Sequence, residues 1–454
     1  SQLITSIDFA KRDDVMPAIA SSQFDLVIVD EAHKMAAYQY GNKLDKTSRY
    51  RLGETLSRIS THLLFLTATP HKGDPENFRL FLDLLEPGFF ATSQMLRESI
   101  TARDNPLFIR RVKEDLKDFE GKLLFLPRHV TTLSFNLGVD SPKEKDLYNQ
   151  LSAYINRQYN KALTKDKKNN VAFALVILQR RLASSTYALL KSLQRRKARL
   201  QELLEGAERR GDACLAPTEV DDLSEEERWR EEEIWETLSV AENREELKRE
   251  IETLETLANN ARAIIESETE IKVRELKDTL DELEGCFSGE KILIFTESRD
   301  TLEYLQGKME AWGYTVTVIH GGLRLEERIA AESEFKNRTQ ILIATEAAGE
   351  GINLQFCHLM INYDLPWNPN RLEQRFGRIH RIKQTEVCHL WNLVAPETRE
   401  GDVYKMLLKK IEAECAALKG RVFEILGKIT FDNKPLRELL IDAIRYGDKP
   451  ETKA

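Results

Sequence analysis

The sequence has few cysteines, and none is placed for a metal site or a disulfide framework. Its five cysteines are scattered through 454 residues, and no two of them form a Cys-x-x-Cys pair. Zinc knuckles and ribbons use such pairs, and an odd, scattered set is typical of a reducing compartment. The sequence also lacks a basic-then-apolar signal pattern and any run of about 18 apolar residues. We therefore expect a cytoplasmic protein without a membrane span.

A strong net charge is also missing, because 67 basic residues nearly balance 75 acidic ones and leave −8. The balance is uneven along the chain. Residues 219–256 contain 16 acidic and 5 basic residues, so this segment carries −11 and the rest of the chain +3. The mildly acidic composition therefore does not exclude a nucleic-acid partner. Hydrophobic residues make up 41% of the chain, which excludes a disordered protein and is enough for several buried cores.

Apolar, β-branched runs occur towards both ends of the chain and predict buried strands. Continuous runs of this kind suit strands of a parallel sheet that are covered on both faces. The predicted strands cover residues 3–5, 24–29, 62–66, 291–295, 315–319, 340–344, 359–363 and 387–391. Helical spacing lies between most of them. The pattern predicts an α/β protein with two doubly wound, parallel-sheet lobes.

Changes in composition predict four segments. Residues 1–135 and 286–396 alternate strands and helices, as the two lobes of such a protein do. Residues 136–285 contain long helical patterns with few glycines and prolines, which predicts a helical insertion with antiparallel, partly coiled-coil hairpins. Residues 397–454 predict a C-terminal helical brace.

The insertion contains a basic stretch with two open interpretations. Residues 180–200 carry seven Lys or Arg and no acid, and Pro217 predicts a turn before the acidic segment 219–256. The stretch is either a helix face that is solvated or paired with the acidic segment, or a surface that faces DNA. We favour the first interpretation, because charge runs on helices are most often solvated faces.

Polar residues follow two of the N-terminal strands. Asp30-Glu31-Ala32-His33 comes directly after the strand at 24–29, and Thr67-Ala68-Thr69-Pro70 follows the strand at 62–66. The carboxyl ends of parallel strands face the crevice where such sheets bind ligands. At a phosphoryl-transfer site, an acid in this position holds Mg²⁺, directly or through water, and a second acid orients the attacking water.

The second lobe carries two further motifs. The segment Thr345–Leu354 contains Gly349-Glu350-Gly351, whose glycines let backbone amides approach a phosphate. Arg371–Arg381 contains four arginines, and those at 371, 375 and 378 share one face of a predicted helix. Arg378 and Arg381 are three residues apart and can project together. Paired guanidinium groups suit the transition-state charge on a γ-phosphate, which is the arginine-finger role.

These motifs resemble those of superfamily 2 helicase-like ATPases. Asp30–His33 is similar to motif II, the Walker B or DEAH box, and Thr67–Thr69 is similar to motif III. Thr345–Leu354 is similar to motif V, and Gln374–Arg381 is similar to motif VI. The resemblance covers nearly the whole chain and is closest to the SWI/SNF-type group. The features that point to this group are Thr69–Gly73, Ile109–Arg111 with Leu126–Arg128, and the helical insertion.

Two bacterial branches of the group share the Gly349–Gly351 form. One contains the RapA-like, RNA-polymerase-recycling ATPases, and the other contains helicase-like proteins of the DISARM anti-phage system. Gln179–Leu182 and Ala443–Gly447 resemble the DISARM type more closely. The resemblance therefore implies a role in bacterial phage defence, with a polymerase-associated ATPase as the alternative.

The resemblance implies two RecA-like lobes with ATP and Mg²⁺ in the cleft, and translocation on double-stranded DNA through nonspecific backbone contacts. It also implies a role for each matching residue. Asp30 and Glu31 would be the Mg²⁺ and water residues, Arg378 and Arg381 the fingers, and Gly349, Gly351 and Gln374 nucleotide-site residues. His33, Thr67 and Thr69 would couple the sites, while Thr345, His320, Gly321, Thr296 and Ser298 would contact DNA. For Thr296 and Ser298 a satisfied turn residue is an equal alternative.

One family element has no match. A P-loop needs Gly-Lys followed by Ser or Thr, and the Gly-Lys pairs at residues 121, 307 and 427 are followed by Leu, Met and Ile. Only 29 residues precede Asp30, so we expect the first lobe to be incomplete at its N-terminal side and these residues alone to be inactive. The rival interpretation is a non-catalytic nucleic-acid-binding scaffold derived from a motor. For the protein as a whole, we expect protein partners from a defence system or from RNA polymerase.

Overall fold

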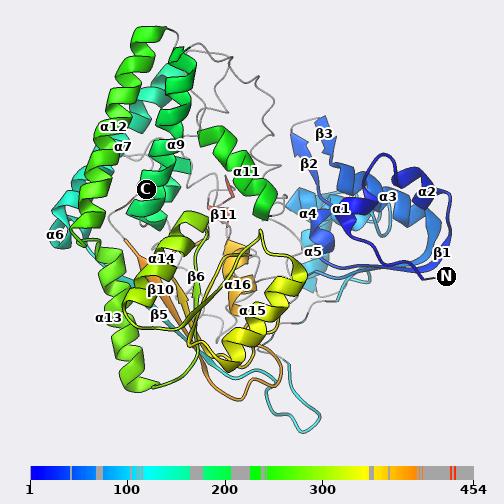
Figure 1. Ribbon diagram of the computed structural model, residues 1–454. Coiled ribbons are helices and arrows are strands. Elements are labelled where there is room, and N and C mark those ends of the chain that lie inside the picture. Colours follow the sequence, from blue (N-terminus) through cyan, green and yellow to red (C-terminus); the bar gives the residue numbers. More distant parts are fainter. Residues whose placement is uncertain are drawn as a thin grey trace. The chain divides into compact units, whose positions relative to one another are not determined.

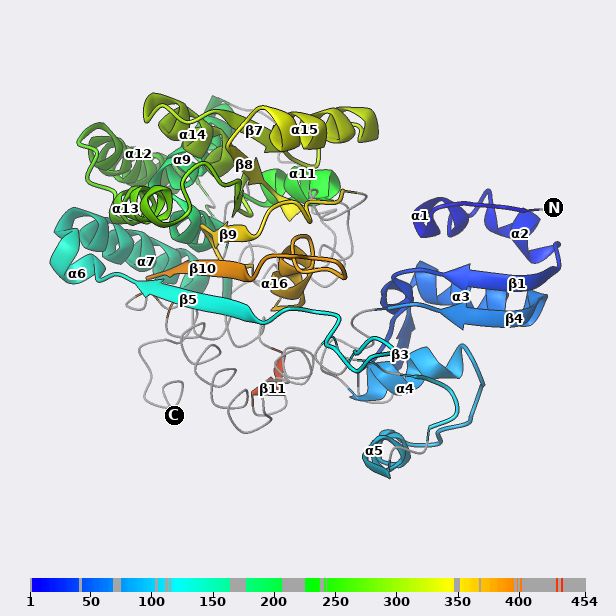
Figure 2. The same ribbon diagram turned by 90° about the horizontal axis from the view of Figure 1, so that it is seen from below.

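A computed structural model (Figures 1 and 2) describes most of the chain. The residues described are 2–40, 43–67, 75–102, 105–109, 111, 113, 116–163, 177–205, 225–236, 241, 243–346, 352–366, 369–395, 398, 401, 430–431 and 434–435. The chain divides into two compact units. The first contains Ser1–Asp115 with Arg421–Leu436, and the second contains Leu116–Gly420 with Arg437–Ala454.

A two-stranded parallel sheet organises the first unit. Strand β1 (Phe24–Val29) pairs with β4 (Ser60–Phe65), and helix α3 (Ser48–Ile59) precedes β4. Thr47 begins α3, because its side chain accepts a hydrogen bond from the Tyr50 amide at 3.1 Å. The other elements are α1 (Ile7–Ala10), α2 (Met16–Ala20), the 3₁₀ turn Ala32–Lys34, the hairpin β2 (Ala37–Tyr40) and β3 (Lys43–Lys46), α4 (Pro75–Asp83) and α5 (Ser93–Ala102).

The two faces of this sheet differ in burial. One face packs on the apolar core of the unit, to which α3 and α4 contribute. The opposite face is exposed, with Leu26 at 54%, Ile28 at 57%, Leu64 at 46% and Leu66 at 44%. The strand predicted at residues 3–5 is absent, because these residues lie outside helix and strand.

A six-stranded, fully parallel sheet organises the second unit. Its strand order is β5-β10-β9-β6-β8-β7, and Figure 2 shows β5, β10 and β9 side by side. The strands are β5 (Arg128–Ser134), β6 (Ile292–Phe295), β7 (Val316–Ile319), β8 (Ile341–Ala344), β9 (Leu359–Asn362) and β10 (Cys388–Val394). All residues of β6, β8 and β9 are buried, as their continuous apolar sequences predicted.

Strand β5 joins this sheet from a part of the sequence that we expected in the first lobe. Its Arg128 is the register partner of Cys388 in β10. The boundary predicted at residue 135 therefore lies beyond the division between Asp115 and Leu116. A residue pattern within β5 cannot reveal a partner strand that lies 260 positions later in the chain.

Helices cover both faces of the larger sheet. Helices α13 (Ile271–Cys286) and α14 (Arg299–Ala311) bury leucines against the face that contains Ile292 and Ile294. On the other face, Arg375 of α16 (Pro369–Phe376) lies 5.3 Å from the Phe295 ring centre. Helix α15 (Leu325–Asn337) packs beside β7.

The helical insertion forms a bundle of its own, as predicted. Its described helices are α6 (Leu137–Asp140), α7 (Pro142–Leu163), α9 (Thr186–Glu205), α11 (Glu225–Glu236) and α12 (Arg244–Glu266). Leu204 lies beside Arg244, and Arg196 lies beside Glu250, so α9 and α12 run antiparallel (Figure 1). The turn predicted near Pro217 lies outside the described residues. So does most of the C-terminal brace, of which only β11 (Thr430–Phe431) and β12 (Lys434–Pro435) are described in strands.

The basic stretch of the insertion is paired with acids. Six of its seven basic residues have a carboxylate partner: Arg180 and Arg181 pair with Glu232, Arg195 with Asp300, Arg196 with Glu250, Lys197 with Glu255, and Arg199 with Glu202. Three of these acids belong to the acidic segment or its end. The contacts favour the acid-paired interpretation over a surface that faces DNA. Among the described residues, no helix is both long enough and apolar enough to span a membrane.

Candidate functional site

In the first unit, the acidic motif occupies a strained loop after β1. Glu31 has a φ of 50° and a ψ of 40°, in the left-handed region that non-glycine residues rarely adopt. The Asp30 carboxylate accepts a hydrogen bond from the Glu31 amide at 2.9 Å. A backbone conformation of this kind costs on the order of 1–3 kcal/mol and is concentrated at functional sites. The position that we predicted to orient the attacking water is therefore also the strained one.

The same loop is joined to Thr67, the second residue after β4. His33 Nδ1 lies 3.0 Å from Thr67 Oγ1, and the two residues are 34 positions apart. His33 Nδ1 also lies 3.2 Å from Glu31 Oε2. The backbone adds a bond from the Ala32 amide to the Leu66 carbonyl at 3.0 Å. The structure thus brings Glu31, His33 and Thr67 together, whereas Thr69 lies outside the described residues.

In the second unit, three neighbouring strands end in the same kind of dipeptide. Thr296-Glu297 follows β6, Thr345-Glu346 follows β8, and Tyr363-Asp364 follows β9. Because these strands are adjacent and parallel, their carboxyl ends meet at one edge of the sheet. Three carboxylates are therefore placed close together.

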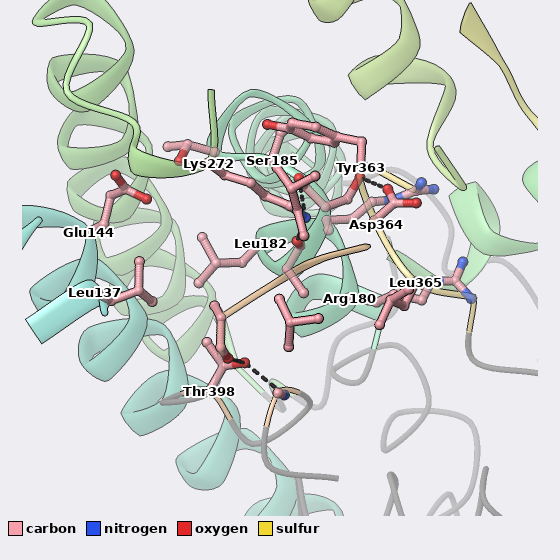
Figure 3. A pocket seen from close by; sticks show the side chains of 18 of the residues that line it. Leu137, Glu144, Arg180, Leu182, Ser185, Lys272, Tyr363, Asp364, Leu365 and Thr398 are labelled. Carbon is pink, nitrogen blue, oxygen red and sulfur yellow. Dashed lines mark hydrogen bonds between the residues drawn. The ribbon is translucent and has the colours of Figure 1, made fainter. Parts of the chain in front are cut away.

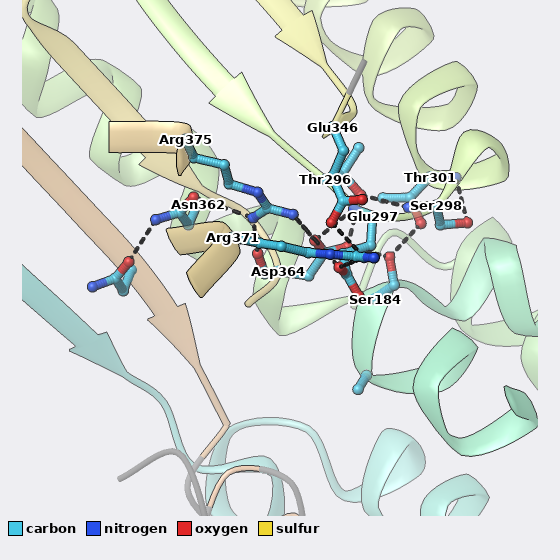
Figure 4. A network of polar contacts seen from close by, with 12 residues as sticks. Ser184, Thr296, Glu297, Ser298, Thr301, Glu346, Asn362, Asp364, Arg371 and Arg375 are labelled. Carbon is cyan, nitrogen blue, oxygen red and sulfur yellow. Dashed lines mark hydrogen bonds and ion pairs between the residues drawn. The ribbon is translucent and has the colours of Figure 1, made fainter. Parts of the chain in front are cut away.

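Two arginines of α16 meet these carboxylates in a buried set of contacts that we call the strand-end network (Figure 4). Its members are Ser184, Thr296, Glu297, Ser298, Thr301, Glu346, Asn362, Asp364, Arg371 and Arg375. Arg371 Nη1 lies 2.7 Å from Glu346 Oε1 and 3.6 Å from Glu297 Oε1. Arg375 Nη1 donates to the Asp364 carbonyl at 2.8 Å.

Asp364 connects the network to the helical insertion. Its Oδ2 accepts hydrogen bonds from Ser184 Oγ at 2.5 Å and from Thr296 Oγ1 at 2.7 Å, and its Oδ1 accepts from the Glu297 amide at 2.7 Å. Ser184 Oγ also lies 2.7 Å from Thr301 Oγ1. Because Ser184 belongs to the insertion, the Asp364 carboxylate joins the insertion to the ends of β6 and β9.

Burial and charge set the protonation of the two glutamates. Burial, and then the charge of Glu346, raise the pKa of Glu297 to about 7. Burial also opposes the ionisation of Glu346, but Arg228, Arg371 and Arg375 together hold its pKa below its usual value. The network therefore contains one firmly ionised carboxylate beside one that can take up a proton near neutral pH.

The expected helical face of motif VI is shorter than predicted. Arg371 and Arg375 lie on α16 and both reach Glu297, but the helix ends at Phe376, so Arg378 lies beyond it. Arg378 Nε donates to the Gln374 carbonyl at 3.2 Å, and Arg381 Nε donates to the Gly377 carbonyl at 2.9 Å. A glycine at 377 favours such an end to the helix.

The residues predicted to contact DNA differ in exposure. Thr345 is fully buried, and its Oγ1 makes no hydrogen bond to any described residue. Thr296 is also fully buried and donates to Asp364, while Ser298 begins α14 and accepts from Arg181 Nη1 at 3.2 Å. These contacts favour the alternative that Thr296 and Ser298 are satisfied turn residues. His320 is partly exposed, and burial together with the charge of Arg299 lowers its pKa.

Gly349 and Gly351 lie outside the described residues. Sequence reasoning overlooked Glu297, Glu346, Asp364 and Arg228. A signal for the three acids was present, because each lies two residues after a buried strand.

A cavity of about 90 Å³ adjoins the network (Figure 3). Glu297, Ser298 and Asp364 line it together with apolar residues of the insertion. Lys272 in its wall donates to the Ala183 carbonyl at 2.7 Å. The cavity is far smaller than the roughly 300–1,000 Å³ of typical ligand pockets. We therefore do not assign the nucleotide to it.

Comparison with known proteins adds family evidence to this geometry. The helicase conserved C-terminal domain matches residues 271–383. A Bacillus subtilis (strain 168) protein described as an uncharacterized ATP-dependent helicase, YqhH, is 31% identical over 444 residues, which is 95% of this chain and 66% of that protein. The RNA polymerase-associated protein RapA of Pseudomonas syringae pv. syringae (strain B728a) is 27% identical over 407 residues, which is 85% of this chain and 36% of that protein.

The chain thus spans about two thirds of the first relative and about a third of the second. Among solved structures, the Sulfolobus solfataricus SWI2/SNF2 ATPase core in complex with dsDNA is similar at 19% identity and a TM-score of 0.33. The match covers 89% of this chain and 69% of that one. A TM-score this low supports no inference about function.

Proposed function

Because this chain belongs to the SNF2-type group of superfamily 2 helicase-like proteins, we propose that it forms part of an ATP-driven motor that translocates on double-stranded DNA. The observation that carries the proposal is the contact of His33 with Thr67, which joins the acidic motif to the next strand end. In a motor, such a contact would pass a change at the nucleotide to the rest of the lobe. The rival, a non-catalytic scaffold, gives no reason for the strained backbone at Glu31.

We assign roles in hydrolysis to the residues that match the helicase motifs. Glu31 orients the attacking water, and Arg378 and Arg381 stabilise the charge that develops on the γ-phosphate. Asp30 would hold Mg²⁺, because a carboxylate that bonds the next amide through one oxygen keeps the other for a hard cation. Mg²⁺ binds one or two carboxylates together with the phosphates of a nucleotide, and its bound form would neutralise phosphate charge.

The phosphate-binding loop would come from outside these 454 residues. None of the three Gly-Lys pairs is followed by Ser or Thr. The exposed apolar face of β1 and β4 supports this proposal, because apolar sheet faces are normally covered by another layer. We propose that the part of the lobe that carries the P-loop extends this sheet and covers its exposed face.

The experiment compares ATP turnover by the intact protein with turnover by the 454 residues alone. The intact protein should hydrolyse ATP faster when duplex DNA is added, and Glu31→Gln should abolish turnover. Glu86→Gln makes the same change at an exposed glutamate outside the sheet and serves as the control that keeps turnover. The 454 residues alone should show no appreciable turnover. Robust hydrolysis by them that Glu31→Gln abolishes would contradict the missing P-loop.

The cellular setting separates two versions of the proposal. The likeness of Gln179–Leu182 to DISARM-type proteins supports phage defence, and the 27% identity to RapA supports association with RNA polymerase. Purification of the tagged protein from its host distinguishes them. Polymerase subunits at a stoichiometric level would support the second setting, and defence proteins without polymerase would support the first.

A further inference from the structure

Helix α11 lies on the surface that we propose for DNA. A Cβ atom at Gly321 would lie 2.9 Å from Glu225 Oε2 and 3.0 Å from Glu225 Cβ, so the side chain of Glu225 packs directly on this glycine. The Trp229 ring centre lies 6.3 Å from that of His320. Arg228 Nη1 lies 2.7 Å from Glu346 Oε2, next to Thr345 in the chain.

These three contacts come from one turn of one helix. Arg228 and Trp229 are 4% and 8% exposed, so the contact is closely packed. One turn further along α11, Glu232 pairs with Arg180 and Arg181. The helix is therefore held between the insertion and the end of the larger sheet. Within the described residues, it covers His320 and Gly321 and anchors at the residue after Thr345.

We propose that α11 is an internal competitor of DNA, and that it must leave His320, Gly321 and Glu346 before this surface can bind a duplex. The proposal rests on the proposed function, since it takes His320, Gly321 and Thr345 as the DNA-contacting residues. Helix α11 contains seven acidic and two basic residues. A helix of this charge cannot remain on a surface that a phosphate backbone approaches, because like charges repel at close range.

The burial of Thr345 has a simple explanation under this proposal. Its hydroxyl is fully enclosed and has no hydrogen-bond partner among the described residues. A buried polar group without a hydrogen-bond partner destabilises the fold. A rearrangement that exposes Thr345 to a phosphate oxygen would supply the missing partner. Binding of DNA would thus satisfy a hydroxyl that has no hydrogen-bond partner among the described residues.

Displacement of α11 and binding of DNA must then be coupled in both directions. Coupling between two such equilibria typically changes an affinity by about 5-fold to 150-fold. A bond that locks α11 in place should weaken DNA binding by a factor in this range. A change that weakens only the contact of α11 with the loop should strengthen DNA binding. Neither effect requires ATP, so both can be measured apart from turnover.

The first experiment locks the helix with a disulfide. Gly321 and Glu225 are both changed to cysteine. A Cβ atom at position 321 would lie 3.0 Å from Cβ of residue 225, and the two atoms need to move apart only slightly to reach the roughly 3.5–4.5 Å between the Cβ atoms of a disulfide. The affinity for a fluorescently labelled duplex of mixed sequence is measured by anisotropy before and after reduction. The oxidised form should bind at least about fivefold more weakly than the same protein after reduction. Glu225→Cys alone is the control, and its affinity should not depend on the reductant.

The second experiment uses two variants that remove the same charge. Glu225→Ala removes the contact with Gly321, whereas Glu233→Ala removes an exposed carboxylate from the same helix. Glu225→Ala should raise the affinity for the duplex clearly more than Glu233→Ala does. Hydrogen exchange in Glu225–Glu236 should also increase when DNA is added to the unmodified chain.

Each outcome decides the proposal. It is overturned if the disulfide fails to form, if the oxidised and reduced forms bind equally well, or if the two alanine variants behave alike. If neither this chain nor the intact protein binds duplex DNA, the proposed function fails as well. Normal melting of the reduced double-cysteine protein confirms that a lost affinity does not come from unfolding.

Discussion

Replacing Arg196 with alanine should destabilise the helical insertion strongly. Arg196 is completely buried, and its guanidinium donates to Glu250 Oε1 and to Tyr154 Oη, each at 2.8 Å. Tyr154 Oη donates to the same carboxylate oxygen at 2.8 Å. These side chains come from α9, α12 and α7, so three helices meet at one buried ion pair.

The magnitude follows from the carboxylate that is left behind. Removing one partner of a buried ion pair typically costs about 3–5 kcal/mol, because the remaining charge is buried without compensation. Arg196→Ala should therefore lower the free energy of unfolding by about this amount. Urea unfolding followed by circular dichroism measures this loss.

Lys197→Ala is the matched control on the neighbouring residue. Its partner Glu255 is 54% exposed, and exposed pairs contribute only about 0–1 kcal/mol. Equal losses for the Arg196 and Lys197 variants would refute the reasoning, as would a loss below about 1 kcal/mol for Arg196→Ala. The guanidinium of Arg196 is fully buried, so no DNA phosphate can reach it. A charge reversal such as Arg196→Glu would therefore report on folding and not on DNA binding.

Three further predictions concern protonation, turnover and DNA. Burial raises the pKa of Glu144 from its usual 4.5 to about 7, so ionisation of this carboxyl destabilises the fold as the pH rises from 4.5 towards 7. In thermal unfolding, Glu144→Gln should leave stability unchanged near pH 4 and raise it by up to about 3 kcal/mol near pH 8. Arg381→Ala should lower kcat of the intact protein by about 10³–10⁵ at an unchanged Tm, and a loss below tenfold would exclude the finger role. The affinity for duplex DNA should not depend on base sequence, and a clear preference for one sequence would contradict backbone recognition. In anisotropy titrations, the logarithm of the association constant should fall with the logarithm of the salt concentration at a slope of about −0.9 per phosphate contact.

The strands of the larger sheet were the most predictable part of the fold. Ile292–Phe295 and Ile341–Ala344 are short, continuous apolar runs, and both are fully buried strands. Their order in the sheet was not predictable in the same way, because it depends on pairing between distant segments. Arg128–Ser134 shows this most clearly, since it joins the sheet across the whole insertion.

The candidate site was predictable where its residues follow strands and not where they come from the insertion. Asp30, Glu31 and Thr67 stand at strand ends, and the sequence places them in order. Arg228 lies in a run of acids that predicts only a solvated helix face. Its partner Glu346 is fixed by tertiary packing, and no local pattern reports which arginine in the chain will reach a given carboxylate.

The insertion is therefore joined to the motifs of the second unit by polar contacts and not only by apolar packing. Ser184 bonds Asp364, Arg181 bonds Ser298, and Arg228 pairs with Glu346. Buried polar contacts tolerate little displacement, because each separated partner is left with an unsatisfied group. A movement of Glu346 must then either carry Arg228 and its helix along or break a buried ion pair. Either way, the insertion responds to a movement of the strand ends. If the insertion is replaced by that of a relative, this response is kept only when the new insertion also supplies the partners of Asp364 and Glu346, which here are Ser184 and Arg228.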